Sequence, residues 1–361
     1  MKKLMMMAVM LVASATAFAG DSDALKAILK AKTYAEAETL LNSSLASLAN
    51  DAEKAKAYNK LVDLAMDVFT AQSTIQTENQ VAAQMGKEAK PFDEALMTQM
   101  AYNALVAATE CDKFDQLPNE KGKVAPKFAA KNAQRLWIGP RNQLVNAGQE
   151  ALSAHDNATA RKYWEMFALS DQLPLFKDCN REAQKPFFGQ VARYAAIFAY
   201  QDKDMQKALK LAEIAMTDPE EYENGLNLKL EVLGDGLQTK EDTLNYYNQL
   251  KDIYAEHKTD GVMEKLYNTL LSLGQEAEAT KVLDDALAVN PDNVVALADK
   301  GLNLINKDAA EAANNGAALE IVAEMALKSL QLDHSLSSIP NYLLNRHYLR
   351  KHGANAYYGQ G

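Results

Sequence analysis

A stretch of helical periodicity at residues 260–291 constrains the fold of this chain more than any other feature. Large apolar residues recur three and four positions apart in its first half, a Leu-Gly-Gln turn follows, and Ala and Leu recur in its second half before Pro291. Such spacing places side chains on one face of an α-helix, and a following Pro ends the helix. The stretch therefore predicts two amphipathic helices joined by a tight turn. Their inward positions are Met263, Leu266, Tyr267 and Leu270, then Ala279, Leu283 and Ala286.

Related patterns precede and follow this pair. One unit starts at Arg141, turns at residues 155–157 and is closed by Pro174, and the next is closed by Pro219. Small residues at one spacing, which let neighbouring helices approach closely, mark that next unit: Ala192, Ala195, Ala196 and Ala199, then Ala208, Ala212 and Ala215. A looser unit occupies residues 220–258, and another begins after Pro291 with an insertion at residues 307–316.

This spacing resembles the tetratricopeptide repeat (TPR), a helix–turn–helix unit of about 34 residues. The resemblance covers residues 141–333 and implies an all-α fold, a right-handed α-α superhelix of TPR-like helical hairpins. Tyr267 departs from the pattern, which prefers a small residue there. With the secretion signal predicted below for residues 1–19, and with an irregular N-terminal half, the chain resembles the secreted bacterial TPR proteins of the cell envelope.

The first residues have the pattern of a secretory signal peptide. Lys2 and Lys3 precede an apolar run, and Ala17-Phe18-Ala19 forms a small-x-small cleavage site. We predict a signal peptide at residues 1–19, cleaved after Ala19, and a periplasmic, secreted or cell-envelope location. The apolar run is too short to cross a bilayer, and no later stretch is longer, so we expect no transmembrane segment in the mature chain.

Three further regions are expected. Residues 20–135 form an N-terminal helical region with a long loop at residues 111–131, where Pro and Gly oppose a long helix. A loop of that length is often functional, and the alternative is a plain surface excursion. Residues 140–336 form the TPR-like repeats. Residues 337–361 form a C-terminal capping helix and tail.

The charge balance argues against nucleic acid as a partner. The net charge is −10, and it becomes −12 when the two signal-peptide lysines are removed. Such a surface repels nucleic acid and anionic membranes.

Two cysteines, Cys111 and Cys179, are present. In an oxidising compartment they are a disulfide candidate, which would contribute about 4 kcal/mol by closing a long loop. The alternative is two buried free thiols.

No catalytic, metal or cofactor motif is found. His347 and His352 are five residues apart, so they do not share a helix face as metal ligands would. We therefore expect no enzyme, no metal site and no cofactor.

The TPR resemblance implies a groove lined by the first helices of successive repeats, in which a peptide docks. Seven residues share that face and form the candidate binding set: Asn142, Gln149, Gln190, Arg193, Tyr200, Glu264 and Asn268. The predicted function is a non-enzymatic TPR scaffold that mediates protein or peptide binding in the periplasm or cell envelope. The alternative function is carbohydrate (glycan) binding by a helical-repeat surface protein. These residues can also belong to an ordinary amphipathic surface.

The helix after Pro291 differs, because its corresponding face is apolar: Val295, Ala298, Leu302 and Ile305. Exposed apolar patches mark contacts, so we expect the C-terminal helix or a partner to cover this face.

Overall fold

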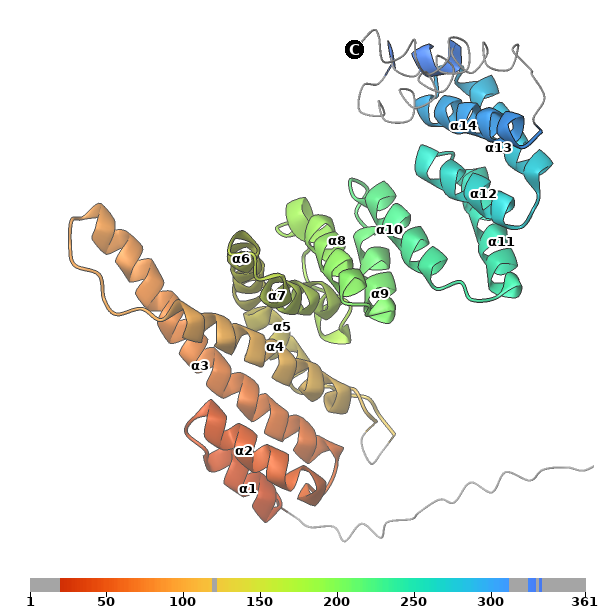
Figure 1. Ribbon diagram of the computed structural model, residues 1–361. Helices are drawn as coiled ribbons and strands as arrows, with labels where there is room; N and C mark the ends of the chain where they lie inside the picture. Colours follow the sequence, from red (N-terminus) through yellow and green to blue (C-terminus); the bar gives the residue numbers. More distant parts are fainter. Residues whose placement is uncertain (1–19, 119–121, 312–323, 329–330, 333–361) are drawn as a thin grey trace, which may run out of the picture. The chain divides into compact units, whose positions relative to one another are not determined.

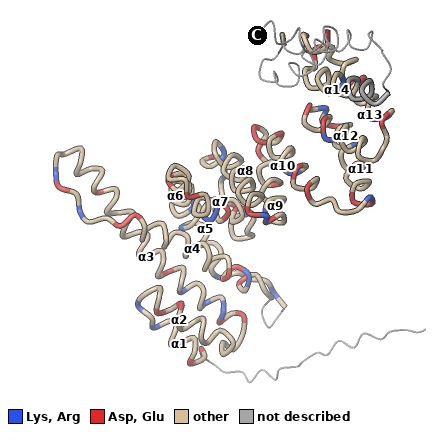
Figure 2. Tube along the Cα trace, in the orientation of Figure 1, with Lys and Arg blue, Asp and Glu red and all other residues tan. Residues whose placement is uncertain are grey.

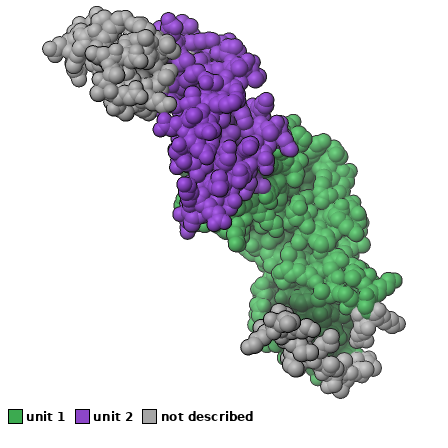
Figure 3. Space-filling model, turned by 90° about the vertical axis from the view of Figure 1, so that its right-hand side faces the viewer, with its two compact units in different colours: residues 1–225 green, residues 226–361 purple. Residues whose placement is uncertain are grey.

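The computed structural model describes residues 20–118, 122–311, 324–328 and 331–332. All regular structure in these residues is helical, which confirms the predicted all-α fold class (Figure 1). The predicted signal peptide, the capping helix and tail, and both histidines of the C-terminal helix lie outside the described residues. The chain forms two compact units, residues 1–225 and 226–361, which are described separately (Figure 3).

The first unit begins with short helices that pack on a long hairpin. Side-chain oxygens of Ser22, Thr33, Asn50 and Asp93 accept a backbone N–H in the first turn of α1, α2, α3 and α4, so each start is specified locally. The elements are α1 (Asp23–Lys30), α2 (Tyr34–Ser44), η1 (Leu45–Ser47), α3 (Asp51–Gln84), α4 (Glu94–Asp115) and α5 (Ala129–Leu136).

The loop after α4 is shorter than predicted. Cys111 lies inside α4, which continues to Asp115. The Asp115 carboxylate accepts hydrogen bonds from the backbone N–H groups of Lys127 and Phe128, at 2.9 and 2.8 Å. The chain is thereby tied back to α4 before α5 begins, because one buried acid satisfies two amides.

Two helical hairpins complete this unit. They are α6 (Gly139–Ser153) with α7 (Asn157–Ser170), and α8 (Lys185–Gln201) with α9 (Met205–Ala215), with η2 (Pro174–Phe176) between them. Each hairpin turns through one left-handed residue, His155 at φ 60° and Lys203 at φ 63°. The next residue, Asp156 or Asp204, caps the second helix. The same turn in both hairpins supports their reading as repeats.

The second unit contains the helical stretch at residues 260–291 that was predicted first from the sequence. The boundary between the units falls within α10 (Tyr222–Asp235), and the second unit contains the rest of α10 with α11 (Lys240–Glu256), α12 (Asp260–Ser272), α13 (Glu276–Val289) and α14 (Val294–Glu311). Gly274, at φ 73°, occupies the left-handed position between α12 and α13. All seven predicted inward positions of these two helices are buried. Tyr267 is buried between the helices although it is larger than the residue that the pattern prefers there.

The apolar face of α14 is only partly covered. Ala298 is buried, whereas Val295 and Leu302 are half-buried. The Ile305 side chain and the helix expected to cover this face lie outside the described residues. Within the described part of the chain, no helix is long and apolar enough to cross a membrane.

Candidate functional site

A fully buried arginine lies at the centre of the candidate site. Arg141 is on the first turn of α6, with Pro140 before it, and its side chain is 0% exposed. Its guanidinium lies 4.5, 4.4 and 5.6 Å from the ring centroids of Trp137, Phe167 and Phe176. Three aromatic faces therefore surround one cation, an arrangement that stabilises the charge when water is absent.

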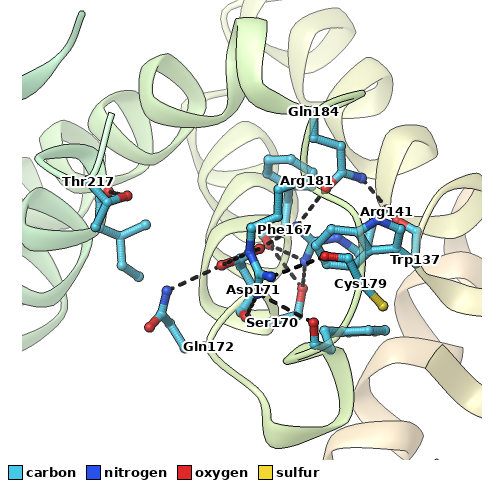
Figure 4. Close-up of polar contacts among 12 residues, drawn as sticks. Trp137, Arg141, Phe167, Ser170, Asp171, Gln172, Cys179, Arg181, Gln184 and Thr217 are labelled. Carbon is cyan, nitrogen blue, oxygen red and sulfur yellow. Dashed lines mark hydrogen bonds and ion pairs between the residues drawn. The ribbon is translucent and has the colours of Figure 1, made fainter. Parts of the chain in front are cut away.

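Hydrogen bonds hold the same guanidinium (Figure 4). Nη1 donates to the Phe167 carbonyl at 2.7 Å and to Ser170 Oγ, and Nη2 donates to Gln184 Oε1 at 3.1 Å. Burial lowers the pKa of Arg141 to about 10, so it remains charged at neutral pH. A buried charge requires such partners, because its desolvation costs several kcal/mol.

Asp171 balances this charge and links it to the surface. One carboxylate oxygen lies 3.8 Å from Arg141 Nη2 and accepts from Arg181 Nε at 3.2 Å. The Asp171 carboxylate is therefore shared by a buried and a half-exposed arginine. Arg181 also donates to four backbone carbonyls, those of residues 171, 176, 177 and 179.

A cavity of about 450 Å³ opens beside this network. It is formed by the end of α7, the residues before α8, the start of α8 and the end of α9. In the view of Figure 4, Thr217 lies on one side, and Arg181 and Gln184 lie on the other. The lining residues are Asp171, Gln172, Arg181, Gln184, Lys185, Phe188, Thr217, Asp218 and Pro219.

The lining combines charge with apolar surface. Arg181 and Lys185 are cationic, Asp171 and Asp218 are acidic, and Phe188 supplies an aromatic face. Concave sites with a few polar groups and an apolar lining are typical of small-molecule binding. Cys, His and Ser do not occur among the lining residues, and the described residues contain no cluster of three or more metal-ligating side chains.

The seven residues of the candidate binding set do not line this cavity. Asn142 comes nearest, because its Oδ1 accepts from Gln184 Nε2 at 3.1 Å. Gln149 and Gln190 are exposed, and Arg193 is ion-paired with Glu221 at 2.7 Å.

The rest of that set is spread over both units. Tyr200 is half-buried, with Lys203 Nζ 5.4 Å from its ring centroid. Glu264 and Asn268 are exposed on α12, in the second unit. Their common role in a groove stays a prediction. Figure 2 shows acidic and basic residues interleaved along the described helices.

The structure has the two cysteines as free thiols, not as the predicted disulfide. Cys111 Sγ donates to the Ala55 carbonyl of α3 at 3.3 Å, and burial raises its pKa to about 12. Burial also raises the pKa of Cys179. The Cys111 thiol is turned into the α3–α4 interface, where it acts as a small apolar side chain.

Comparison with curated proteins gives short similarities to an epimerase. No protein-family model matches the chain. A stretch of 54 residues is 48% identical to L-ribulose-5-phosphate 4-epimerase UlaF of Salmonella paratyphi C (strain RKS4594) and of Salmonella choleraesuis (strain SC-B67). It is 15% of this chain and 24% of each epimerase. The chain thus spans about a quarter of the length of these curated relatives.

This similarity overturns the predicted function. The sequence predicted a non-enzymatic scaffold for protein or peptide binding, with glycan binding as the alternative, and that prediction is wrong. The curated proteins named above are epimerases, and nothing in their names indicates a scaffold. The shared stretch is too short to make this chain an enzyme.

Proposed function

We propose that this chain is a TPR-like helical-repeat protein of the bacterial cell envelope that holds a small polar ligand in the cavity beside Arg181. The left-handed turn residues in three hairpins, His155, Lys203 and Gly274, support the repeat assignment. The predicted signal peptide at residues 1–19 supports export to the periplasm or beyond. A right-handed superhelix is the arrangement that such repeats imply.

The cavity carries this proposal. Its size falls in the range of small-molecule sites, and its charged groups come from three different segments of the chain. The buried Arg141 holds two lining residues in place, because it lies next to the Asp171 carboxylate and donates a hydrogen bond to Gln184. A fixed lining favours affinity, because fewer side chains lose freedom when a ligand binds.

The proposed partner is a small ligand. The protein, peptide or glycan partners expected from the sequence belonged to the scaffold function and are not proposed. We assign binding to this cavity and no bond-making step. Thr217, the one hydroxyl in the lining, already donates to the Ile214 carbonyl at 2.7 Å. It has no basic partner that would activate it as a nucleophile among the lining residues.

The test is a thermal-shift screen of the mature chain with small metabolites. The panel contains L-amino acids, dicarboxylates and sugar phosphates, including L-ribulose 5-phosphate, the compound named in the relatives. At least one compound should raise the unfolding temperature of the wild type, because a ligand that binds only the folded state stabilises it.

Two variants locate the effect. Lys185→Glu reverses a charge in the lining and should abolish the shift, whereas Lys210→Glu makes the same change on an exposed part of α9 outside the lining and should leave it intact. A panel without any stabilising compound, or a shift equal in both variants, would contradict the proposal. Sequencing the N-terminus of the protein from a periplasmic extract tests the location, and a start at Gly20 is expected.

A further inference from the structure

The charged residues of the cavity divide into compensated and uncompensated groups. Asp171 is paired with Arg181 and lies close to Arg141, so its charge is balanced inside the protein. Lys185 and Asp218 have no ion pair with each other or with any other described residue. Both line the cavity, so they are available to a bound ligand, and the two carry opposite charges.

Lys185 is placed to receive an anionic group. It is the first residue of α8, a helix of 17 residues, and it is exposed. The N-terminal end of a helix carries a partial positive charge, which adds to that of the lysine. Arg181, four residues earlier in the chain, also lines the cavity, with its charge paired to Asp171.

Asp218 is placed to receive a cationic group. One carboxylate oxygen, Oδ1, accepts from the Glu220 amide at 3.0 Å, and no hydrogen bond to Oδ2 is formed by the described residues. The side chain lies directly against α8 at Gly189, where an added Cβ would come within 2.5 Å of Oδ2. Asp218 is half-buried, so leaving its charge unpaired has a cost that a ligand removes.

Gly189 gives the spacing between these two groups. Residues four apart lie on one helix face, so Lys185 and Gly189 are about one turn, roughly 6 Å, apart along α8. The carboxylate of Asp218 lies against Gly189, and the side chain of Lys185 leaves the same helix one turn earlier. A ligand with opposite charges separated by a few bonds fits this arrangement, because the flexible lysine adjusts its reach.

An apolar surface completes the lining. Phe188 is half-buried and held by Phe167, with ring centroids 5.7 Å apart, and Pro219 follows Asp218 directly. An aliphatic or aromatic group on the ligand can pack against them. Dianions would be repelled by Asp218, and polyamines by Lys185.

We propose that the cavity binds a free α-amino acid with an apolar side chain. Its carboxylate bonds to Lys185, its ammonium group bonds to Asp218, and its side chain packs on Phe188. The inference rests on the proposed function and names the ligand class of that same site.

The experiment is calorimetric titration of the mature chain with three compounds of one shape. L-leucine carries both charges, 4-methylpentanoate lacks the ammonium group, and 3-methylbutylamine lacks the carboxylate. Leucine should bind at least about 10-fold more tightly than either analogue, because each analogue leaves one charged group of the site unpaired.

Two conservative variants assign the roles. Asp218→Asn keeps an oxygen for the Glu220 amide, and it should weaken leucine binding about 10-fold while leaving 4-methylpentanoate unaffected. Lys185→Gln should weaken leucine similarly and leave 3-methylbutylamine unaffected. Lys210→Gln, outside the lining, is the matched control. A purely structural effect would weaken every compound alike, so the selective pattern identifies direct contacts.

The outcomes separate the two claims. If leucine, valine and phenylalanine all fail to bind while a dicarboxylate or sugar phosphate binds in a Lys185-dependent manner, the amino-acid inference is refuted and the proposed function stands. If no compound of the panel binds, both are refuted. Equal affinity for leucine and 4-methylpentanoate also refutes the inference, because Asp218 then has no role in recognition.

Discussion

Replacing Arg141 by Met tests whether the buried cation holds the first unit together. Met has a similar length and helix propensity and contacts aromatic rings well, so packing against Trp137 and Phe167 is largely kept. The change removes hydrogen bonds to the Phe167 carbonyl, Ser170 Oγ and Gln184 Oε1.

The magnitude follows from the groups left behind. The Phe167 carbonyl still accepts from Ser170 Oγ at 3.0 Å, and Asp171 keeps its ion pair with Arg181. Gln184 Oε1 is the acceptor left without a donor, at a cost of about 1–3 kcal/mol. Breaking a buried pair outright costs about 3–5 kcal/mol, so with Asp171 still paired we expect a loss of about 2–3 kcal/mol.

Tryptophan fluorescence during urea unfolding measures this loss for the first unit alone. The chain has two tryptophans, Trp137 and Trp164, and both lie within residues 1–225. The control is Lys90→Met, which removes an exposed ion pair with Glu78 and should cost no more than about 1 kcal/mol. If Arg141→Met lowers the free energy of unfolding by less than about 1 kcal/mol, or raises it, the reasoning is refuted. The polar network would then stabilise the unit no more than an apolar side chain at the same position.

Three further predictions concern other parts of the fold. His155→Gly and Lys203→Gly relieve left-handed backbone and should each stabilise the first unit by about 0.5–1 kcal/mol in thermal unfolding, and destabilisation would argue against the assigned turns. Gly148→Ala would place a Cβ 2.3 Å from Trp164 Nε1, so we expect a loss of about 1–3 kcal/mol and altered tryptophan fluorescence, whereas an unchanged spectrum would contradict the close approach. Burial raises the pKa of Asp299 to about 6, so its contribution to stability is complete below about pH 4 and lost as pH rises through 6. Asp299→Asn should therefore stabilise the second unit by roughly 2 kcal/mol at pH 7.5 and by about a third as much at pH 4.5, as measured by hydrogen exchange of α12 and α14, and equal effects at both pH values would refute the assignment.

Local patterns in the sequence predicted the helices well. The periodicity at residues 260–291 predicted α12, the turn at Gly274 and α13, because apolar spacing and a turn residue act within a few positions. The same reasoning placed the turn after α6 at residues 155–157, close to the left-handed His155. It was less successful after Cys111. The Pro and Gly further along suggested a loop that begins at Cys111, but the helix continues to Asp115 and the loop begins only after it.

The candidate site was not predictable in this way. In the sequence, Arg141 only marks the start of a repeat, and arginine is usually exposed. Its burial depends on aromatic rings from three segments, at Trp137, Phe167 and Phe176. In the same way, Asp218 resembles an ordinary acidic helix start until α8 is packed beside it at Gly189.

The sequence by itself determined that this protein is built of amphipathic helices, where most of them begin and where the hairpins turn. Those properties depend on side-chain spacing and capping between residues a few positions apart. Only the tertiary structure decided that Arg141 is buried and that Lys185 and Asp218 line one cavity. Arg141 meets Phe167 and Gln184 across 26 and 43 residues of chain, and Lys185 and Asp218 are 33 residues apart. A local periodic pattern carries no information about contacts at such separations.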